Sequence, residues 1–297
     1  MFNEKQTRRE FFKFSGLTIL SLTQLSNLFN VNNIGFFLDD DSELCRKKFS
    51  AFVEEGLKDK PIGDAIVEIG KSFLGTEYTA GTLEINSPNE SLVVNLREFD
   101  CVTFVENCLT FARCLKKGKT TFDDYKNELE YIRYRDGKID GYASRLHYFC
   151  DWIYDNENKG IVKNISSELG VEYSKTIDFM STHTKSYKQL SDKDTLESIK
   201  SVENSINSRY HYYIPKKNIA KIHDQLQNGD IIATTTSING LDVTHTGYVY
   251  KGDDGGTYFL HASSKSKEVI ISKNSLADYV AEDSKKTGIM VARPVGI

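Results

Sequence analysis

The periodicity of the apolar residues changes along the chain, and this change constrains the fold more than any other feature. Helical spacing predominates up to about residue 215, and short runs rich in β-branched residues with a period of two follow it. The five runs span residues 229–236, 243–251, 257–261, 268–272 and 288–293. The sequence Asp-Asp-Gly-Gly at 253–256, between the second and third runs, is typical of a hairpin turn. The pattern therefore predicts an α+β fold whose C-terminal third is a small, mainly antiparallel sheet.

Two amphipathic helices are expected ahead of this sheet. Pro61 suits the first position of one helix, whose apolar residues share one face up to a suitable stop at Gly75. The second helix runs from Cys101 to Leu115 and carries a broad apolar stripe, with Asp100 as its N-cap. A stripe of this width predicts a largely buried helix.

The segment from residue 116 to 215 is polar and rich in tyrosine. Helical spacing recurs near residues 122–135, 141–157 and 192–208, and β-branched runs are few. We interpret this segment as a helical insertion between the two helices and the sheet.

Composition and charge narrow the classes of function. An apolar content of 39% is ample for a packed core, which excludes a disordered or collagen-like chain. The net charge of −4 provides no overall attraction to nucleic acid or to anionic lipid. A nucleic-acid partner is therefore not expected.

The N-terminus has the features of an export signal. Residues 7–13 read Thr-Arg-Arg-Glu-Phe-Phe-Lys and precede a mostly apolar stretch at 14–28. Together they resemble a twin-arginine signal, with Phe12 where leucine is more usual. The stretch is too short and too polar for a good membrane span, which needs about 20 apolar residues. We expect residues 1–35 to be a signal and linker that direct export to the periplasm or cell envelope without a stable span in the mature protein; the alternative is an amphipathic first helix with two surface arginines.

Cys101 stands out among the five cysteines. Residues 45, 101, 108, 114 and 150 form no CxxC pair and no cluster with histidine, so neither a disulfide framework nor a zinc site is indicated. Cys101 occupies the first turn of the expected buried helix, where the helix dipole and unpaired N–H groups lower a thiol pKa and hold an oxyanion. Cys101 is thus a candidate nucleophile, and the other cysteines are more simply explained as packing residues.

Two histidines in neighbouring strands are the candidate partners of this thiol. If the hairpin centres near Asp253, residues whose numbers sum to 506 face each other, which makes His245 and His261 cross-strand neighbours. One imidazole then orients the other, the arrangement that activates a nucleophile. Gly247, on the same face, leaves room for a helix end to approach. The alternatives are two core histidines, or a metal site with Asp242, which is weaker because Asp242 has the opposite strand parity.

The order of these motifs resembles a known superfamily. The motifs are Asp100-Cys101 opening a helix, Asn228-Gly229-Asp230 before a strand, His245-Thr246-Gly247, and Leu260-His261-Ala262-Ser263. They resemble the NlpC-type papain-fold cell-wall cysteine hydrolases. Segments 75–84, 94–106, 132–137 and 144–149 resemble more specifically the N-acetylmuramoyl-L-alanine amidase-like branch of that superfamily.

The resemblance implies a papain-like (NlpC-type) core, in which a helix bearing the nucleophile packs on a mainly antiparallel sheet, with a large helical insertion. Residues 36–115 would form the helical half of the core, 116–215 the insertion and 216–297 the sheet half. The implied reaction is hydrolysis of the amide between N-acetylmuramic acid and L-Ala in peptidoglycan or muropeptide fragments, with no metal or organic cofactor. Cys101 would be the nucleophile, His245 the general base and His261 its orienting partner.

Further residues are candidates for substrate contact. Tyr78 matches a tyrosine that lines the site in such enzymes, although a core position is nearly as compatible with the sequence. The insertion contributes cationic and aromatic side chains suited to carboxylates and sugar faces: Arg133, Arg135, Arg145, His147, Tyr148 and Trp152. We expect Arg145 and Arg135 to include a ligand contact, against the alternative of a solvated helix face with an aromatic core.

Three other functions are compatible with the same motifs. The first is an endopeptidase of the same superfamily that cuts between γ-D-glutamate and the diamino acid, because both bonds are amides. The second is a non-catalytic cell-wall-binding module, against which the Cys/His/His set argues. A lipid acyltransferase on a related frame is a distant third.

Overall fold

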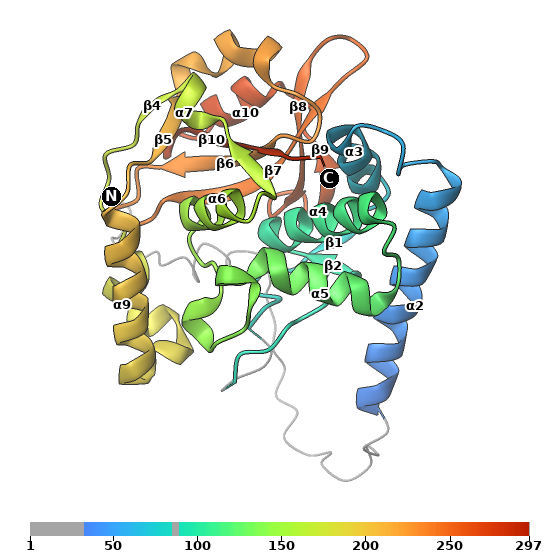
Figure 1. The fold of residues 1–297 in the computed structure, drawn as a ribbon. Coiled ribbons are helices and arrows are strands. Elements are labelled where there is room, and N and C mark those ends of the chain that lie inside the picture. Colours follow the sequence, from blue (N-terminus) through green and yellow to red (C-terminus); the bar gives the residue numbers. More distant parts are fainter. Residues whose placement is uncertain (1–32, 85–88, 297) are drawn as a thin grey trace.

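The computed structural model describes residues 33–84 and 89–296, in which helices and one large sheet form a mixed α+β fold (Figure 1). The helices are α2 (Asn33–Glu54), α3 (Ile62–Lys71), α4 (Cys101–Lys117), α5 (Phe122–Arg133), α6 (Phe149–Asn158), α7 (Ser166–Leu169), α8 (Phe179–Thr182), α9 (Lys193–Asn207) and α10 (Leu276–Ala281). The 3₁₀ helices are η1 (Arg135–Gly137), η2 (Tyr142–Ser144), η3 (Thr184–Ser186), η4 (Lys188–Ser191) and η5 (Lys216–Gln225). The strands are β1 (Glu77–Tyr78), β2 (Glu98–Phe99), β3 (Val162–Asn164), β4 (Val171–Glu172), β5 (Tyr212–Pro215), β6 (Ile231–Thr236), β7 (Val243–Lys251), β8 (Thr257–Ser263), β9 (Glu268–Ile271) and β10 (Lys286–Pro294).

Helix α4 begins where the sequence predicts, because Asp100 caps it. The Asp100 carboxylate accepts the N–H groups of Val102 (3.0 Å) and Thr103 (2.8 Å), and the Asp100 N–H donates to the Thr103 hydroxyl (2.9 Å). This reciprocal capping box fixes Cys101 as the first helical residue. At the other end, Gly118 adopts a left-handed conformation (φ 66°) that terminates the helix.

The sheet confirms the antiparallel expectation for the C-terminal third. Its strand order is β2-β1-β9-β8-β7-β6-β10-β5-β4, with β3 also paired to β10. The five predicted runs correspond to β6 through β10, which are contiguous in this order and antiparallel throughout. The one parallel pair is β1 with β2, among the described strands. The α+β prediction is therefore confirmed.

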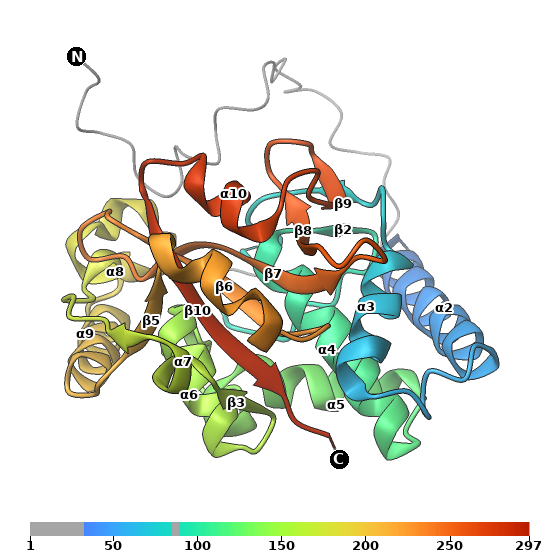
Figure 2. The same ribbon diagram turned by 90° about the horizontal axis from the view of Figure 1, so that it is seen from above.

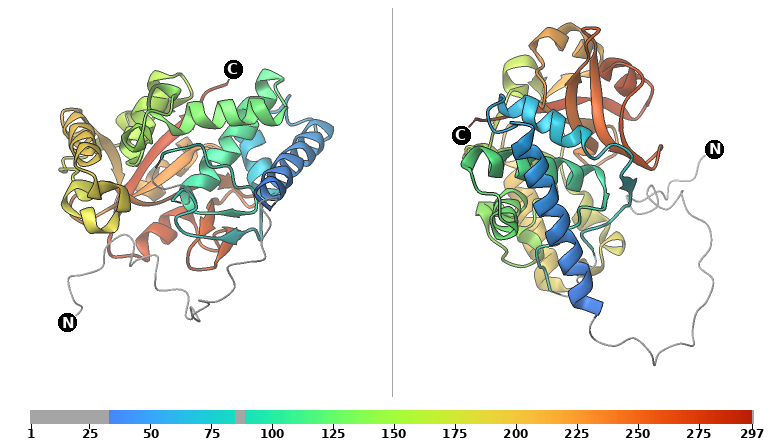
Figure 3. Two further views of the ribbon diagram at one scale, coloured as in Figure 1. Left: turned by 90° about the horizontal axis from the view of Figure 1, so that it is seen from below. Right: turned by 90° about the vertical axis from the view of Figure 1, so that its right-hand side faces the viewer.

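Two apolar cores lie on the two faces of the sheet. On one face, α4 packs against β7, and the Tyr248 hydroxyl donates to the Val105 carbonyl of α4 (2.6 Å). Helix α2 runs along the outside of this helical layer, with Phe49 edge-on to Phe111 of α4 at a ring-centroid distance of 4.9 Å (Figure 3). On the other face, η5 and α10 cover β10 and its neighbours (Figures 1 and 2).

The segment 116–215 differs from the expected helical insertion. It contains α5, α6 and α9, but it also supplies β3 and β5, which pair with β10, and β4, which pairs with β5. The expected helix at 141–157 is instead η2 followed by α6 from Phe149. The sequence analysis missed β3, β4 and β5 because these strands have only two to four residues, too few to show a period of two.

The expected export signal lies almost entirely outside the described residues, which begin at 33. Among the helices that the structure describes, none combines the length and the apolar character needed to cross a membrane.

Candidate active site

Cys101 is placed at the buried N-terminus of α4 by the cap and by two short strands. Its exposed fraction is 7%. Immediately before it, β2 pairs with β1 so that Tyr78 lies beside Phe99, and the Thr79 N–H donates to the Phe99 carbonyl (2.9 Å). The thiol therefore meets the positive end of a 17-residue helix, and Tyr78 lies on the strand next to the approach to Cys101.

His245 and His261 are in direct contact, as the sequence predicts. The His245 Nε2 lies 2.7 Å from the His261 Nδ1, and the two rings meet edge to face at an interplanar angle of 87°. The predicted register is wrong by two residues, because facing residues of β7 and β8 sum to 508, as in Tyr248 with Leu260. A shift of two preserves the face on which each side chain lies, so the imidazoles remain neighbours on a diagonal.

Gly247 makes room for the side chains of the neighbouring strand. A methyl group at Gly247 would lie 2.7 Å from the His261 Cβ, 2.7 Å from the Leu260 carbonyl oxygen and 2.9 Å from the Phe259 ring. The approach of a helix end to Gly247 stays a prediction. The absence of a side chain lets the His261 and Phe259 rings, stacked at 4.6 Å, lie across β7.

The environment keeps both imidazoles neutral. Burial lowers the pKa of His245 well below its usual value, and the neighbouring His261 and Lys286 lower it further. Burial, with the charge of Lys286 as the second cause, lowers the pKa of His261 to about 3. A neutral imidazole can accept a proton from a thiol, so the pair has the protonation state that a general base requires.

Tyr279 of α10 lies beside the histidines, and the sequence analysis missed it. Its ring centroid lies 5.1 Å from that of His261 and 6.3 Å from that of His245. Burial raises the pKa of Tyr279, and the nearby Cys101 is the next cause. The phenol and both imidazoles therefore form one cluster, and the Cys101 thiol is close enough to the phenol to act on it electrostatically. The Ser275 cap of α10, which accepts from the Asp278 N–H (3.2 Å), was the only local signal for this short helix.

Lys286, at the start of β10, is the second residue that sequence reasoning missed. Its ammonium lies 3.8 Å from the centroid of the Tyr279 ring, and its exposed fraction is 8%. Burial lowers the pKa of Lys286 to about 8. No motif in the sequence marks it, because it approaches the histidines only through the pairing of β10 with β6.

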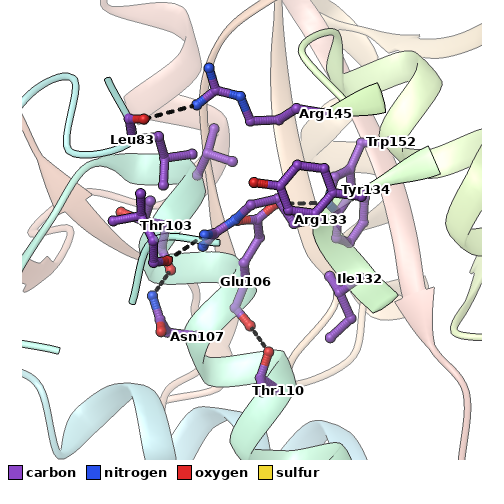
Figure 4. A network of polar contacts seen from close by, with 12 residues as sticks. Leu83, Thr103, Glu106, Asn107, Thr110, Ile132, Arg133, Tyr134, Arg145 and Trp152 are labelled. Atoms are coloured by element: carbon purple, nitrogen blue, oxygen red, sulfur yellow. Dashed lines mark hydrogen bonds and ion pairs between the residues drawn. The ribbon is translucent and has the colours of Figure 1, made fainter. Parts of the chain in front are cut away.

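Arg133 forms part of a closed network rather than a ligand site (Figure 4). Its exposed fraction is 1%; its Nε donates to Glu106 (2.6 Å) and its Nη1 to the Val93 carbonyl (2.6 Å). The Trp152 indole donates to the other oxygen of the same carboxylate (3.3 Å). With these partners, Arg133 and Trp152 hold α4, α5 and α6 together and offer no surface to a substrate.

Arg145 and Arg135 are also engaged by acids. Arg145 is buried, pairs with Glu84 (2.6 Å) and Glu90 (3.3 Å) and lies over the Tyr142 ring. Arg135 is partly exposed and pairs with the buried Asp151 (2.6 Å). Of the two, only Arg135 presents its guanidinium to solvent to any extent.

The two remaining candidates for substrate contact, His147 and Tyr148, differ in burial. The half-buried His147 holds the Tyr142 carbonyl through Nε2 (2.8 Å). Tyr148 is buried and donates to Glu203 (2.7 Å), while the Met180 N–H donates to its hydroxyl (2.8 Å). The structure thus brings His245 and His261 together with Tyr279, whose pKa Cys101 raises, and it places Arg133 and Tyr148 in the interior.

Asp242, the acid of the metal alternative, does not join the histidines. Its carboxylate is buried and accepts the Cys150 N–H (2.9 Å) at the first turn of α6. Asp242 has the opposite strand parity from His245, as the sequence predicts. Its side chain instead joins the β6–β7 connection to α6.

Solved structures of similar proteins share this fold. An N-acetylmuramoyl-L-alanine amidase from Bacteroides uniformis is 35% identical, with a TM-score of 0.74, over 78% of this chain and 98% of that one. A Bacteroides fragilis protein named as a candidate xylanase is 37% identical, with a TM-score of 0.71, over 75% of this chain and 98% of that one. A Legionella pneumophila protein at 21% identity, with a TM-score of 0.66 over 90% of this chain and 97% of that one, shows the fold alone.

Family comparison agrees with the motif analysis. No curated protein matches the sequence. The model of the N-acetylmuramoyl-L-alanine amidase-like family matches residues 68–289, which include Cys101, both histidines, Tyr279 and Lys286. The match extends over most of the chain. The protein therefore belongs to the N-acetylmuramoyl-L-alanine amidase-like family.

Proposed function

We propose that this chain is a cysteine-dependent peptidoglycan amidase that hydrolyses the amide between N-acetylmuramic acid and the L-Ala of the stem peptide. The single observation that carries the proposal is the 2.7 Å contact of His245 with His261. We place Cys101, the first residue of α4, beside this pair because its charge acts on Tyr279, whose ring lies next to both imidazoles. Membership of the amidase-like family supports the choice of reaction.

The pairing of the histidines assigns a role to each ring nitrogen. The Nε2 of His245 is engaged with His261, which leaves the Nδ1 of His245 to take the thiol proton. In this assignment the Nε2–H of His245 donates to the Nδ1 of His261, so His261 carries its own proton on Nε2. His261 orients the base, and the His245 imidazole activates Cys101.

The proposed reaction proceeds in two steps. Proton transfer to His245 leaves the Cys101 thiolate, which attacks the lactyl carbonyl carbon; the new S–C bond places negative charge on the carbonyl oxygen. The first-turn N–H groups and the dipole of α4 stabilise that oxyanion. The C–N bond then breaks, and the imidazolium donates its proton to the departing L-Ala nitrogen. Water, deprotonated by His245, next attacks the thioester, the S–C bond breaks, and the muramyl carboxylate leaves.

The framework for this chemistry would be a papain-like core of the NlpC type. In this proposal residues 36–115 and 216–297 form the two halves of the core, and 116–215 form one wall of the substrate cleft. Tyr78, on the strand beside β2, and the partly exposed Arg135 and His147 are the candidate contacts with the substrate. Export by a twin-arginine-type signal would place the enzyme in the periplasm or cell envelope, where its substrate lies.

The chemistry of the cluster argues against two alternatives. Glycoside hydrolysis, suggested by the name of one similar protein, uses two carboxylates on either side of the scissile bond. The residues around Cys101 instead supply imidazoles, a phenol and an ammonium group. A non-catalytic binding module would have no use for a histidine pair held neutral by burial.

Digestion of a purified disaccharide-tripeptide separates the proposal from the endopeptidase alternative. We expect wild-type protein to release free disaccharide and an intact tripeptide with L-Ala at its N-terminus, identified by mass spectrometry. Cys101→Ala and His245→Ala variants should release neither product. A disaccharide that retains L-Ala and D-glutamate would refute the amidase, and unchanged turnover by Cys101→Ala would refute the nucleophile.

A further inference from the structure

Lys286 is an unusual feature of the cluster because a largely buried side chain carries a charge without a counter-ion. Its exposed fraction is 8%, and among the described residues no carboxylate lies within ion-pairing distance of its Nζ. A largely buried ammonium group without a counter-ion loses part of its hydration and gains no ion pair in return. Its contact with the Tyr279 ring at 3.8 Å offsets only part of that loss.

Charged groups surround Lys286 without neutralising it. Asp283 and Glu282, in the turn after α10, raise its pKa, whereas Lys216 of η5 and Lys265 of the β8–β9 turn lower it. Lys216 itself donates to the Asp283 carbonyl (2.8 Å). The pKa of Lys286 remains near 8, so the group carries its positive charge at neutral pH. The site therefore retains a positive charge that a ligand can pair.

The position of Lys286 relates it to the histidine pair. The Lys286 Nζ lies 3.8 Å from the centroid of the Tyr279 ring, and that centroid lies 5.1 Å from the centroid of the His261 ring. The Tyr279 ring therefore lies next to both the ammonium group and the imidazole of His261. The charge of Lys286 also lowers the pKa of both histidines, which places it in the same electrostatic environment.

We propose that Lys286 is a specificity residue that binds the first free carboxylate of the leaving peptide, the α-carboxylate of the γ-linked D-glutamate. The inference rests on the proposed function. The muramyl side of the scissile bond carries no negative charge. An ammonium group beside the site can therefore form an ion pair only with a carboxylate on the peptide side. An extended two-residue segment spans about 7 Å, which suits the distance from a bond at the histidine pair to the Lys286 ammonium.

A pair of substrates that differ in one functional group tests this proposal. Muramyl-L-Ala-D-glutamate has the free α-carboxylate, and muramyl-L-Ala-D-isoglutamine has an amide in its place. We expect wild-type kcat/KM to favour the carboxylate by about tenfold to a hundredfold, the range of a charge-assisted hydrogen bond. Lys286→Met should reduce this ratio to near 1, and Lys286→Arg should retain part of it.

Lys285→Met is the matched control, because it removes the same charge from an exposed neighbour. Its substrate ratio should equal that of the wild type. Inhibition of wild-type protein by the dipeptides L-Ala-D-glutamate and L-Ala-D-isoglutamine needs no variant, and the first should inhibit more strongly. An unchanged ratio in Lys286→Met, or equal inhibition by the two dipeptides, would overturn the assignment while leaving the amidase intact. If wild-type protein cleaves neither these substrates nor the disaccharide-tripeptide, the proposed function itself fails, and this inference with it. If it cleaves the disaccharide-tripeptide alone, inhibition of that reaction by the two dipeptides decides the inference.

Discussion

The chain buries cationic side chains in two regions, and their partners differ completely. Arg133 is enclosed by Glu106, the Val93 carbonyl and the α4–α6 layer, with an ion-pair distance of 2.6 Å. Lys286 is buried to a similar degree, yet it has an aromatic ring in place of an acid. Removing one partner of a buried ion pair destabilises a fold, whereas a largely buried charge without a counter-ion is expected where a ligand or a reaction uses it. The comparison separates the structural polar network from the cluster that we propose to be catalytic.

The largest effect that tests this difference between the two regions is expected at Cys101. Cys101→Ala should reduce kcat by about a thousandfold or more, because a proposed covalent step loses its nucleophile. The thermal midpoint should remain within a few degrees of the wild type, since the capping box is made by Asp100 and Thr103. Turnover and thermal unfolding, measured on the same preparation, check the predicted loss of kcat and the predicted retention of the thermal midpoint. A large loss of stability with retained turnover would reverse the assignment.

The opposite result is expected at Arg133. Arg133→Met leaves the Glu106 carboxylate buried without its cation, at a cost of about 3–5 kcal/mol in the free energy of unfolding. Denaturant unfolding measures this cost, and kcat/KM per folded molecule should stay close to that of the wild type. Arg46→Met is the matched control, because the Arg46 side chain is 70% exposed and its unfolding free energy should hardly change. Equal effects from the two variants would contradict the structural role of the network.

Substitution of Gly247 is expected to affect both activity and stability, each to a smaller extent than the two variants above. Gly247→Ala would place a methyl group 2.7 Å from the His261 Cβ, so we expect displacement of His261 and loss of about tenfold to a hundredfold in kcat/KM, with destabilisation of about 1–3 kcal/mol. Gly296→Ala is the control, because nothing lies within 4 Å of the added methyl. Wild-type activity in Gly247→Ala would show that the 2.7 Å histidine contact is not needed for turnover.

The smallest effect concerns pH. A base must be neutral to accept a proton, and burial, then His261, then Lys286 lower the pKa of His245 from 6.5. The acid limb of kcat/KM should therefore lie below pH 6.5, with activity lost only as the pH falls through the lowered value. Lys286→Met removes one of the lowering charges, so its acid limb should move to higher pH, while that of Lys285→Met should not move. A wild-type limb at or above 6.5 would show that the buried histidine is not the base.

The sequence predicts what local rules determine. Asp100 and Thr103 define a cap, the runs after residue 229 have a period of two, and the parity of His245 and His261 survives the two-residue register error. The order of motifs in the chain also identifies the family.

The rest depends on long-range packing that no local pattern encodes. Arg133 and Tyr148 have the composition of a ligand-binding surface, but Glu106 and Glu203, distant in sequence, bind them in the interior. Tyr279 joins the cluster because α10 contacts β8 and β10, and Lys286 joins it through the pairing of β10 with β6. The short strands β3 and β5 are likewise defined by their pairing with β10.

The most direct test of the central claim is the identity of the covalent intermediate. Acid-quenched mixtures of enzyme and disaccharide-tripeptide, taken during turnover, can be analysed by intact-protein and peptide mass spectrometry. The account predicts an added mass equal to the muramyl disaccharide acyl group, located on Cys101 and absent from Cys101→Ala. An adduct that retains L-Ala and D-glutamate, or turnover without any adduct on Cys101, would contradict it.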